Sequence, residues 1–183
     1  MYGMIHRAMK DMISELLGKE AWFALEKKLQ IGPAELLTGM VYEDALTLDI
    51  VAEAAVRLNL TVDECLFEFG KYWIRYADRG SFSSIMDFTG RNLPNFINNL
   101  DHLHLAVSAA MPGTRLPSFR TLQSSNGHLE VEYRSDRVGM ENFVCGLFQG
   151  LLERFCVDGQ VLIVSRGEKS IIFDIRYQDR DSA

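Results

Sequence analysis

Apolar residues recur with the period of an α-helix along most of the first 110 positions. Residues 4–17 show this most clearly, since their apolar side chains fall on one stripe that ends near Gly18. Thr61 and Glu64 have the spacing of a capping box, and Pro94 suits the first turn of a helix. The pattern also predicts helices over 20–29, 47–58 and 61–77, a shorter one from Ser81, and one through Asn99 and His104 to about Met111.

The period changes after Gly113 and becomes that of β-strands. Short turns around residues 124–128 and 166–169 indicate antiparallel pairs. A helical N-terminal part and a C-terminal part with a four-stranded antiparallel sheet predict an α+β fold rather than a βαβ repeat. The strands are expected over 119–123, 129–137, 161–165 and 170–177, and one more helix over 141–156.

The strand expected over 129–137 has two faces of different chemistry. Its even positions are all charged and are expected to face water. Its odd positions begin with apolar residues and continue with the donors Tyr133, Ser135 and Arg137. Burying three donors without acceptors would cost several kcal/mol. Either an internal Asp or Glu satisfies Arg137, or a ligand with carboxylates at the edge of an apolar body does so.

A histidine lies on the apolar stripe of the helix around residues 100–107. His104 shares that face with Leu100, Leu103 and Val107, whereas His102 lies off it. Such a histidine is either a hydrogen-bonded core residue or an axial ligand to a haem iron. In the second case Asp101, one turn earlier, is a candidate for orienting the ring.

Composition and charge narrow the function further. The chain has 183 residues and a formal net charge of −6, which disfavours nucleic acid and anionic membranes as partners. No apolar run approaches the roughly 20 residues of a membrane span, and the N-terminus lacks a signal peptide's order, so a cytoplasmic location is expected. Cys65, Cys145 and Cys156 are far apart and are interpreted as reduced thiols. The 11 Phe and 8 Met residues suit either a core or a pocket for a large flat ligand.

Several segments occur together in one order along the chain, and two of them contain the candidate residues above. They are Met1-Tyr2-Gly3, Phe69-Gly70-Lys71-Tyr72-Trp73, Leu100-Asp101-His102-Leu103-His104, Leu116-Pro117-Ser118-Phe119 and Tyr133-Arg134-Ser135-Asp136-Arg137. The last matches the pattern Tyr-x-Ser-x-Arg. In combination these segments resemble the H-NOX (haem nitric oxide/oxygen binding) family, which includes the haem domain of soluble guanylate cyclase and stand-alone bacterial gas sensors. The resemblance covers essentially the whole chain.

The resemblance implies one domain over residues 1–183, with a helical distal lobe over 1–60, a proximal lobe with the sheet over 61–183, and haem b (iron protoporphyrin IX) between them. It assigns His104 as the proximal ligand of the haem iron. Pro117 would press on the porphyrin and Ile5 would pack on its distal side. The haem propionates would be held by Tyr133, Ser135 and Arg137.

The distal pocket decides which gas binds. Oxygen-binding relatives place a Tyr three residues before a Gly in the helix after the Tyr-x-Ser-x-Arg strand. Counted back from Gly146, that position is Phe143, and a shift by one residue would place it at Asn142. Phe143 has no donor. The N–H of Trp73 is a possible donor, but its bulk is expected to fill space. Because bound oxygen needs a hydrogen bond while NO and CO do not, the sequence predicts a ferrous haem that takes NO and CO and resists oxygen.

The implied function is a switch rather than an enzyme. NO would weaken the bond from iron to His104, and the signal would pass to a separate protein such as a histidine kinase or a diguanylate cyclase. A haem peroxidase or oxygenase would need a polar distal residue, and His6 lies off the apolar stripe of its helix. Three alternatives remain: an oxygen-binding member of the family, a fragment of a guanylate cyclase, or a haem-free zinc or thiol redox module using Cys145 and Cys156.

Overall fold

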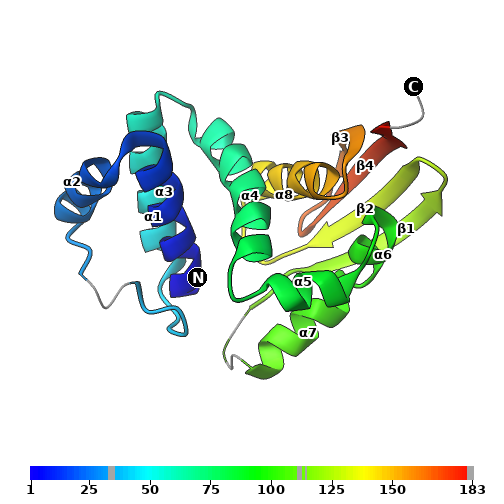
Figure 1. Ribbon diagram of the computed structural model, residues 1–183, viewed down its shortest axis with the longest axis horizontal. Helices are drawn as coiled ribbons and strands as arrows, with labels where there is room; N and C mark the ends of the chain where they lie inside the picture. The colour runs from blue at the N-terminus through cyan, green and yellow to red at the C-terminus, as the bar shows by residue number, and fades with distance from the viewer. Residues whose placement is uncertain (33–35, 111–112, 114, 181–183) are drawn as a thin grey trace.

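The computed structural model describes residues 1–32, 36–110, 113 and 115–180. The N-terminal helices form one body, and the sheet with its covering helices forms a second body beside it (Figure 1). The strands follow the first seven helices, with α8 between β2 and β3, and they pair with one another in one antiparallel sheet, so the α+β fold class is confirmed.

The first four helices follow the predicted pattern with small changes at their ends. Helix α1 stops before Gly18, and Thr61 and Glu64 form the predicted capping box at the start of α4. Their bounds are Gly3–Leu17 (α1), Lys19–Leu29 (α2), Asp44–Leu58 (α3) and Val62–Arg79 (α4). In the part of the chain that the structure describes, no helix is long and apolar enough to cross a membrane.

The predicted single helix through Asn99 is wrong, because two helices occupy this segment. Helix α5 (Ser83–Thr89) precedes them, and α6 (Leu93–Asn98) and α7 (Leu100–Ala110) are separated at Asn99. The side-chain amide of Asn99 donates to the carbonyl of Thr89 at 2.8 Å, which fixes the junction. His104 therefore lies on a helix whose direction is set separately from α6. Met111 lies outside the described residues.

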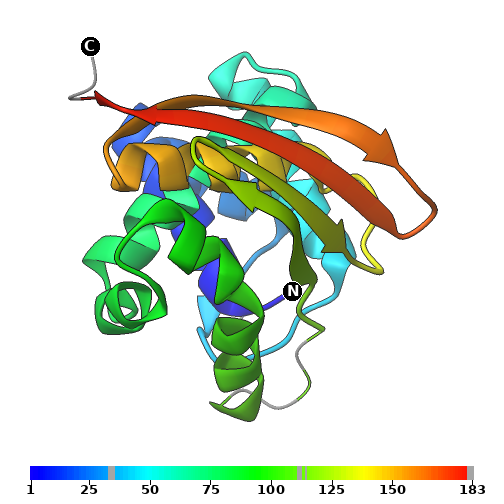
Figure 2. The ribbon, with the colours of Figure 1, turned by 90° about the vertical axis from the view of Figure 1, so that its right-hand side faces the viewer.

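The sheet has the order β1-β2-β4-β3, and every neighbouring pair is antiparallel (Figure 2). The strand predicted over 129–137 ends earlier than expected, because Arg134 already pairs with the first residue of β1 and of β4. Ser135 and Arg137 therefore lie in the connection to α8. The bounds are Ser118–Ser125 (β1), His128–Arg134 (β2), Val157–Arg166 (β3) and Ser170–Asp179 (β4), with α8 at Glu141–Arg154.

Within the strand the apolar face is buried as predicted, but the charged face is only partly open to water, since the side chain of Glu132 is 12% exposed. Leu129, Val131 and Tyr133 are buried, whereas Arg134 on the charged face is exposed. Helix α8 packs on the buried face, where the ring of Phe148 meets neighbouring aromatic rings.

Two groups of buried side chains form the core. One joins α1, α2 and α3 and includes Phe69 of α4. The other joins the sheet, α8 and the helices α5 to α7, and includes Ile74 and Ala77 of α4. Trp73 packs against both groups. Helix α4 is therefore shared by the two halves of the molecule.

Helices α4 and α8 approach each other closely at two glycines. A Cβ built on Gly70 would lie 2.2 Å from the carbonyl oxygen of Phe143, and one on Gly146 would lie 2.0 Å from that of Phe67. Only residues without a side chain allow this approach. It positions Phe143 on α8 against Phe69 on α4, with ring centres 5.4 Å apart.

Candidate functional site

His104 lies one turn into α7 and faces the start of the sheet. Its Nδ1 is 2.8 Å from the carbonyl oxygen of Pro117. Its ring is also 5.7 Å from the ring of Phe119, which in turn lies 5.3 Å from Tyr133. The fold thus brings the predicted axial residue, Pro117 and the first residue of the Tyr-x-Ser-x-Arg motif to one region.

The contact with Pro117 fixes the chemistry of the imidazole. A carbonyl oxygen only accepts hydrogen bonds, so Nδ1 must donate, and Nε2 of the neutral ring keeps its lone pair. Burial lowers the pKa of His104 and outweighs the opposite effects of the Pro117 carbonyl and Asp101. The ring is therefore neutral at pH 7. A neutral imidazole with Nδ1–H held by the backbone is the form that coordinates a metal through Nε2.

The prediction that Asp101 orients the histidine ring is wrong. Its Oδ1 accepts a hydrogen bond from the backbone N–H of Phe119 at 2.6 Å. A carboxylate can reach a backbone donor here because α7 and β1 pack side by side. Asp101 and His104 thus fasten α7 to β1 at two points, and the partner of the ring is the Pro117 carbonyl.

Tyr133, Ser135 and Arg137 lie together although only the first is in the strand. The backbone N–H of Arg137 donates to the hydroxyl of Ser135 at 3.0 Å. Burial raises the pKa of Tyr133, while a hydrogen bond with Ser135 and the charge of Arg137 act in the opposite direction. The site therefore offers two hydroxyls and one guanidinium at its edge.

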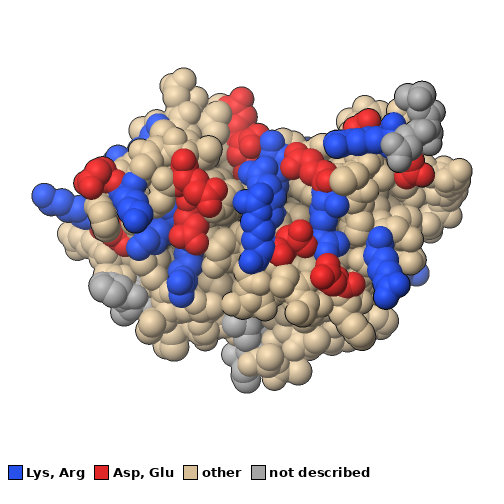
Figure 3. All heavy atoms as spheres, in the orientation of Figure 1, with Lys and Arg blue, Asp and Glu red and all other residues tan. Residues whose placement is uncertain are grey.

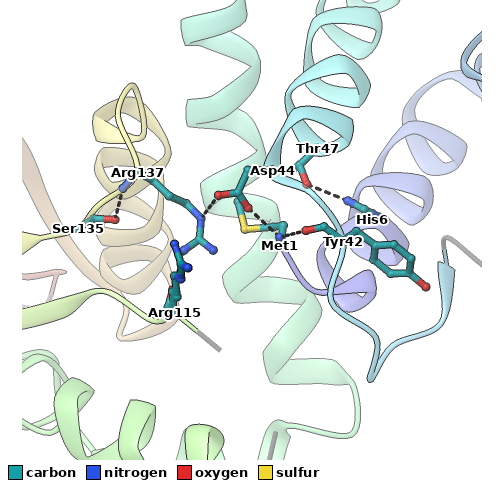
Figure 4. Close-up of polar contacts among 8 residues, drawn as sticks. All are labelled: Met1, His6, Tyr42, Asp44, Thr47, Arg115, Ser135 and Arg137. Carbon is teal, nitrogen blue, oxygen red and sulfur yellow. Dashed lines mark hydrogen bonds and ion pairs between the residues drawn. The ribbon is translucent and has the colours of Figure 1, made fainter. Parts of the chain in front are cut away.

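The alternative that an internal carboxylate satisfies Arg137 also has support. Nε of Arg137 donates to Asp44 at 2.9 Å, and Nη1 donates to the carbonyl of Arg115 at 2.7 Å (Figure 4). The other oxygen of Asp44 accepts from the amino group of Met1 at 2.7 Å. These bonds use two of the five N–H donors of a guanidinium, so three donors remain for a ligand.

Sequence reasoning missed Asp44 and Arg115. Asp44 is 93 positions from Arg137, and its only local signal is a carboxylate in the first turn of α3. Arg115 contributes a backbone carbonyl, a group that every residue has. No pattern in the sequence distinguishes it.

The predicted distal residues border the N-terminal core without being fully buried. Ile5, Trp73 and Phe143 are each partly buried and pack against that group. Met9 and Phe69 are buried within the same core. That Ile5, Trp73 and Phe143 face the distal side of a ligand stays a prediction.

His6 is buried, which its predicted place off the apolar stripe of α1 did not suggest. His6 is 1% exposed, and its Nε2 lies 2.8 Å from the hydroxyl of Thr47. Its ring also lies 5.3 Å from that of Tyr42. Polar partners on α3 and the preceding segment explain how a histidine is accommodated inside the helical half (Figure 4).

Two of the three cysteines, Cys65 and Cys145, are at least partly buried, whereas Cys156 is exposed. All three are free thiols. Burial raises the pKa of Cys65 and of Cys145 to about 11, so both are protonated at neutral pH and are poor nucleophiles or metal ligands. No group of three His, Cys, Asp or Glu side chains that could hold a metal ion occurs among the described residues. A zinc or thiol module is therefore disfavoured.

A haem fits this set of residues. One neutral histidine supplies an axial nitrogen, and hydroxyls with a guanidinium suit acidic groups at the edge of the ring. Partly buried apolar side chains suit its face. The fold and the site together fit the class of histidine-ligated haem-binding domains.

Comparison with known proteins identifies the family. Residues 2–161 match the family model described as Haem-NO-binding. The chain belongs to this family of haem-binding sensor domains.

Among curated relatives, the chain is similar to soluble guanylate cyclase 89Db of Drosophila melanogaster, with 23% identity over 155 residues, covering 85% of this chain and 23% of that protein. It is also similar to soluble guanylate cyclase gcy-34 of Caenorhabditis elegans, with 25% identity over 175 residues, covering 93% of this chain and 26% of the relative. The chain spans about a quarter of the length of these relatives.

Solved structures share the fold. An H-NOX protein from S. oneidensis in the Fe(II) state superposes with a TM-score of 0.88 at 20% identity, covering 98% of this chain and 97% of the other. An oxygen-binding H-NOX domain superposes with a TM-score of 0.84 at 24% identity, covering 98% and 96%. Since an oxygen binder and other H-NOX proteins match alike, the fold does not determine which gas is bound.

Proposed function

We propose that this chain is a sensor of NO and CO that uses ferrous haem b, excludes oxygen, and signals to an effector protein. The observation that carries the proposal is the neutral His104 ring, whose Nδ1–H is held by Pro117 while Nε2 is left to bind a metal. Haem would supply a ferrous iron that binds diatomic gases.

The residues at the edge of the site would hold the propionates. Arg137 keeps three N–H donors beyond those that bind Asp44 and Arg115. The hydroxyls of Tyr133 and Ser135 lie beside it. A carboxylate that receives bonds from a guanidinium and a hydroxyl is bound more strongly than by neutral donors alone, since charge-assisted bonds are roughly twice as strong.

The distal side chains support selection against oxygen. Ile5 and Phe143 carry no hydrogen-bond donor, and Trp73, which has one indole N–H, is expected to fill space by its bulk. Tyr72 is the residue before Trp73 on α4. Its hydroxyl already donates to Glu15 at 2.8 Å, so that donor is not free for bound oxygen. Tyr76 lines a cavity of about 330 Å³ between α1 and α4. NO and CO bind without a donor, whereas bound oxygen needs one.

Helix α7 offers a route for the signal into the sheet. His104 is bonded to the residue just before β1, and Asp101 is bonded to Phe119 within β1. A force on His104 would therefore move β1 with α7. The effector is proposed to be a separate protein such as a histidine kinase or a diguanylate cyclase. The named relatives are guanylate cyclases, so a cyclase region in the same polypeptide is the alternative.

The first test is the absorption spectrum of the reduced, haem-reconstituted protein alone, in air and with NO. The proposal expects a Soret band that shifts with NO and does not shift in air. A stable oxygen complex in air would refute the selectivity. No Soret band after reconstitution would refute the haem function itself.

Variants then test the residues. His104→Ala is expected to lose most bound haem and to regain it with free imidazole, while His102→Ala, on the same helix but exposed, serves as the matched control. Phe143→Tyr is expected to introduce a donor and permit oxygen binding. Asn142→Tyr tests the alternative alignment. If His104→Ala retains full haem without imidazole, another residue is the ligand.

A further inference from the structure

Arg154, the last residue of α8, lies where four helices meet. Its side chain is only 11% exposed, which is unusual for an arginine. Nε is 2.7 Å from Asp78 at the end of α4, and Nη2 is 2.7 Å from Asp87 on α5. Figure 3 shows acidic and basic side chains interspersed across the face of the molecule that is seen in Figure 1.

Aromatic rings complete the surroundings of this guanidinium. Its carbon lies 4.9 Å from the ring centre of Phe155 and 5.5 Å from that of Phe96 on α6. A guanidinium held by two carboxylates and flanked by two rings has little freedom to move. Arg154 therefore joins α8 to α4, α5 and α6 at once.

Helix α5 leads from this cluster to the start of α7. The carbonyl of Thr89, its last residue, accepts from the side-chain amide of Asn99, and α7 begins at Leu100. His104 follows one turn later. A displacement of α5 would therefore change where α7 begins.

We propose that the ion pair of Arg154 with Asp87 is a positioning device for His104, which sets how firmly α7 holds the histidine against the iron. The inference rests on the proposed haem function. The pair with Asp78 joins α8 only to α4, which already packs on it at two glycines. The pair with Asp87 joins the α4–α8 pair to α5, which lies against α7.

Helix α5 is held in the core by buried Met86 and is open on the side of the cluster. A cavity of about 730 Å³ opens beside it and is lined by Asp78, Asp87, Arg154 and Phe155 among others. Phe88 on α5 is 91% exposed and gives α5 little anchorage on that side. Asp87 is 76% exposed, so its removal leaves no buried charge on α5.

The test compares Asp87→Ala with two matched controls in the NO complex of the haem-loaded protein. Asp78→Ala removes the other carboxylate of Arg154, and Asp158→Ala removes an exposed Asp–Arg pair with Arg180 near the start of β3, outside α5 and α7. Absorption bands distinguish His104 bound to iron from His104 released. Asp87→Ala is expected to shift this ratio toward release by about 2- to 30-fold, the range for mutations that modulate coupling between sites.

A second measurement does not depend on haem. Hydrogen exchange of the α7 amides in the haem-free protein is expected to be faster in Asp87→Ala and unchanged in both controls. Asp87→Glu, which restores the charge, should recover both readouts. Equal effects of Asp78→Ala and Asp87→Ala, or an unchanged NO complex in Asp87→Ala, would overturn the inference. If the wild-type protein binds no haem, the proposed function fails instead, while the exchange result still reports on α5 and α7.

Discussion

Replacing Gly146 by alanine should separate α4 from α8. The new Cβ would lie 2.0 Å from the carbonyl oxygen of Phe67, whereas real Cβ atoms essentially never come closer than 3.0 Å. Since the atom struck is backbone, rotation of a side chain cannot relieve the contact. The two helix backbones must therefore move apart by about 1 Å, and the packing around Phe143 must loosen with them.

The net cost combines two opposing effects. Overpacking costs about 1–3 kcal/mol and more where backbone has to shift, so about 3–4 kcal/mol is reasonable for this contact. Alanine gains about 1 kcal/mol over glycine in a helix interior. The expected loss in the free energy of unfolding is therefore about 2–3 kcal/mol, or roughly 5–10 °C in Tm for a chain of this size.

Gly150 on the same helix provides the matched control. A Cβ on Gly150 would lie 3.0 Å from Cβ and Cγ1 of Ile74 and 3.2 Å from Cα of Lys71, so its neighbours need to yield by only a few tenths of an ångström. Gly150→Ala gains the same helix propensity and should change stability by less than about 1 kcal/mol. Both variants are compared with wild type by urea unfolding followed by far-ultraviolet circular dichroism at equal haem content. A Gly146→Ala protein as stable as wild type would refute the reasoning.

Further variants test the other polar contacts. Asp101→Ala removes the acceptor of the Phe119 N–H and should lower the free energy of unfolding by about 1–3 kcal/mol in urea titrations; an unchanged midpoint would show that this bond does not fasten α7. Thr47→Val keeps the shape but removes the partner of the His6 ring nitrogen, with an expected loss of about 1–3 kcal/mol, which thermal unfolding would show or rule out. Burial raises the pKa of Asp44, but hydrogen bonds from two cations outweigh it and lower the pKa below its ordinary value. Its contribution to stability is therefore full above pH about 4 and is lost as the pH falls through the folded pKa, so Asp44→Asn should flatten the acid limb of the stability profile; an unchanged limb would contradict this.

Local pattern predicted the parts of the fold that depend on nearby residues. The stripe ending near Gly18, the capping box at Thr61 and the buried apolar face of β2 all follow from spacing along the chain. Where the outcome depended on distant residues, the prediction failed. The strand ended at Arg134 because its neighbours begin there, and no local property of Ser135 shows this.

The site was predictable to a similar extent. His104 was singled out by its place on an apolar face. Its hydrogen-bond partner is a backbone carbonyl, and because every residue has one, the sequence does not show which carbonyl is used. Asp101 was assigned to the wrong neighbour for the same reason, since its acceptor role depends on where β1 runs beside α7. The pair of Arg137 with Asp44 joins positions that only the folded chain brings together.

The sharing of α4 by both groups of core residues has a consequence for folding. Phe69 is buried with the N-terminal helices, Ile74 is buried with the sheet, and Trp73 touches both. Neither half has a complete core without this helix. The halves should therefore unfold together in one transition rather than in two steps. A protease cut within α4 should unfold both halves instead of releasing one of them as a folded fragment.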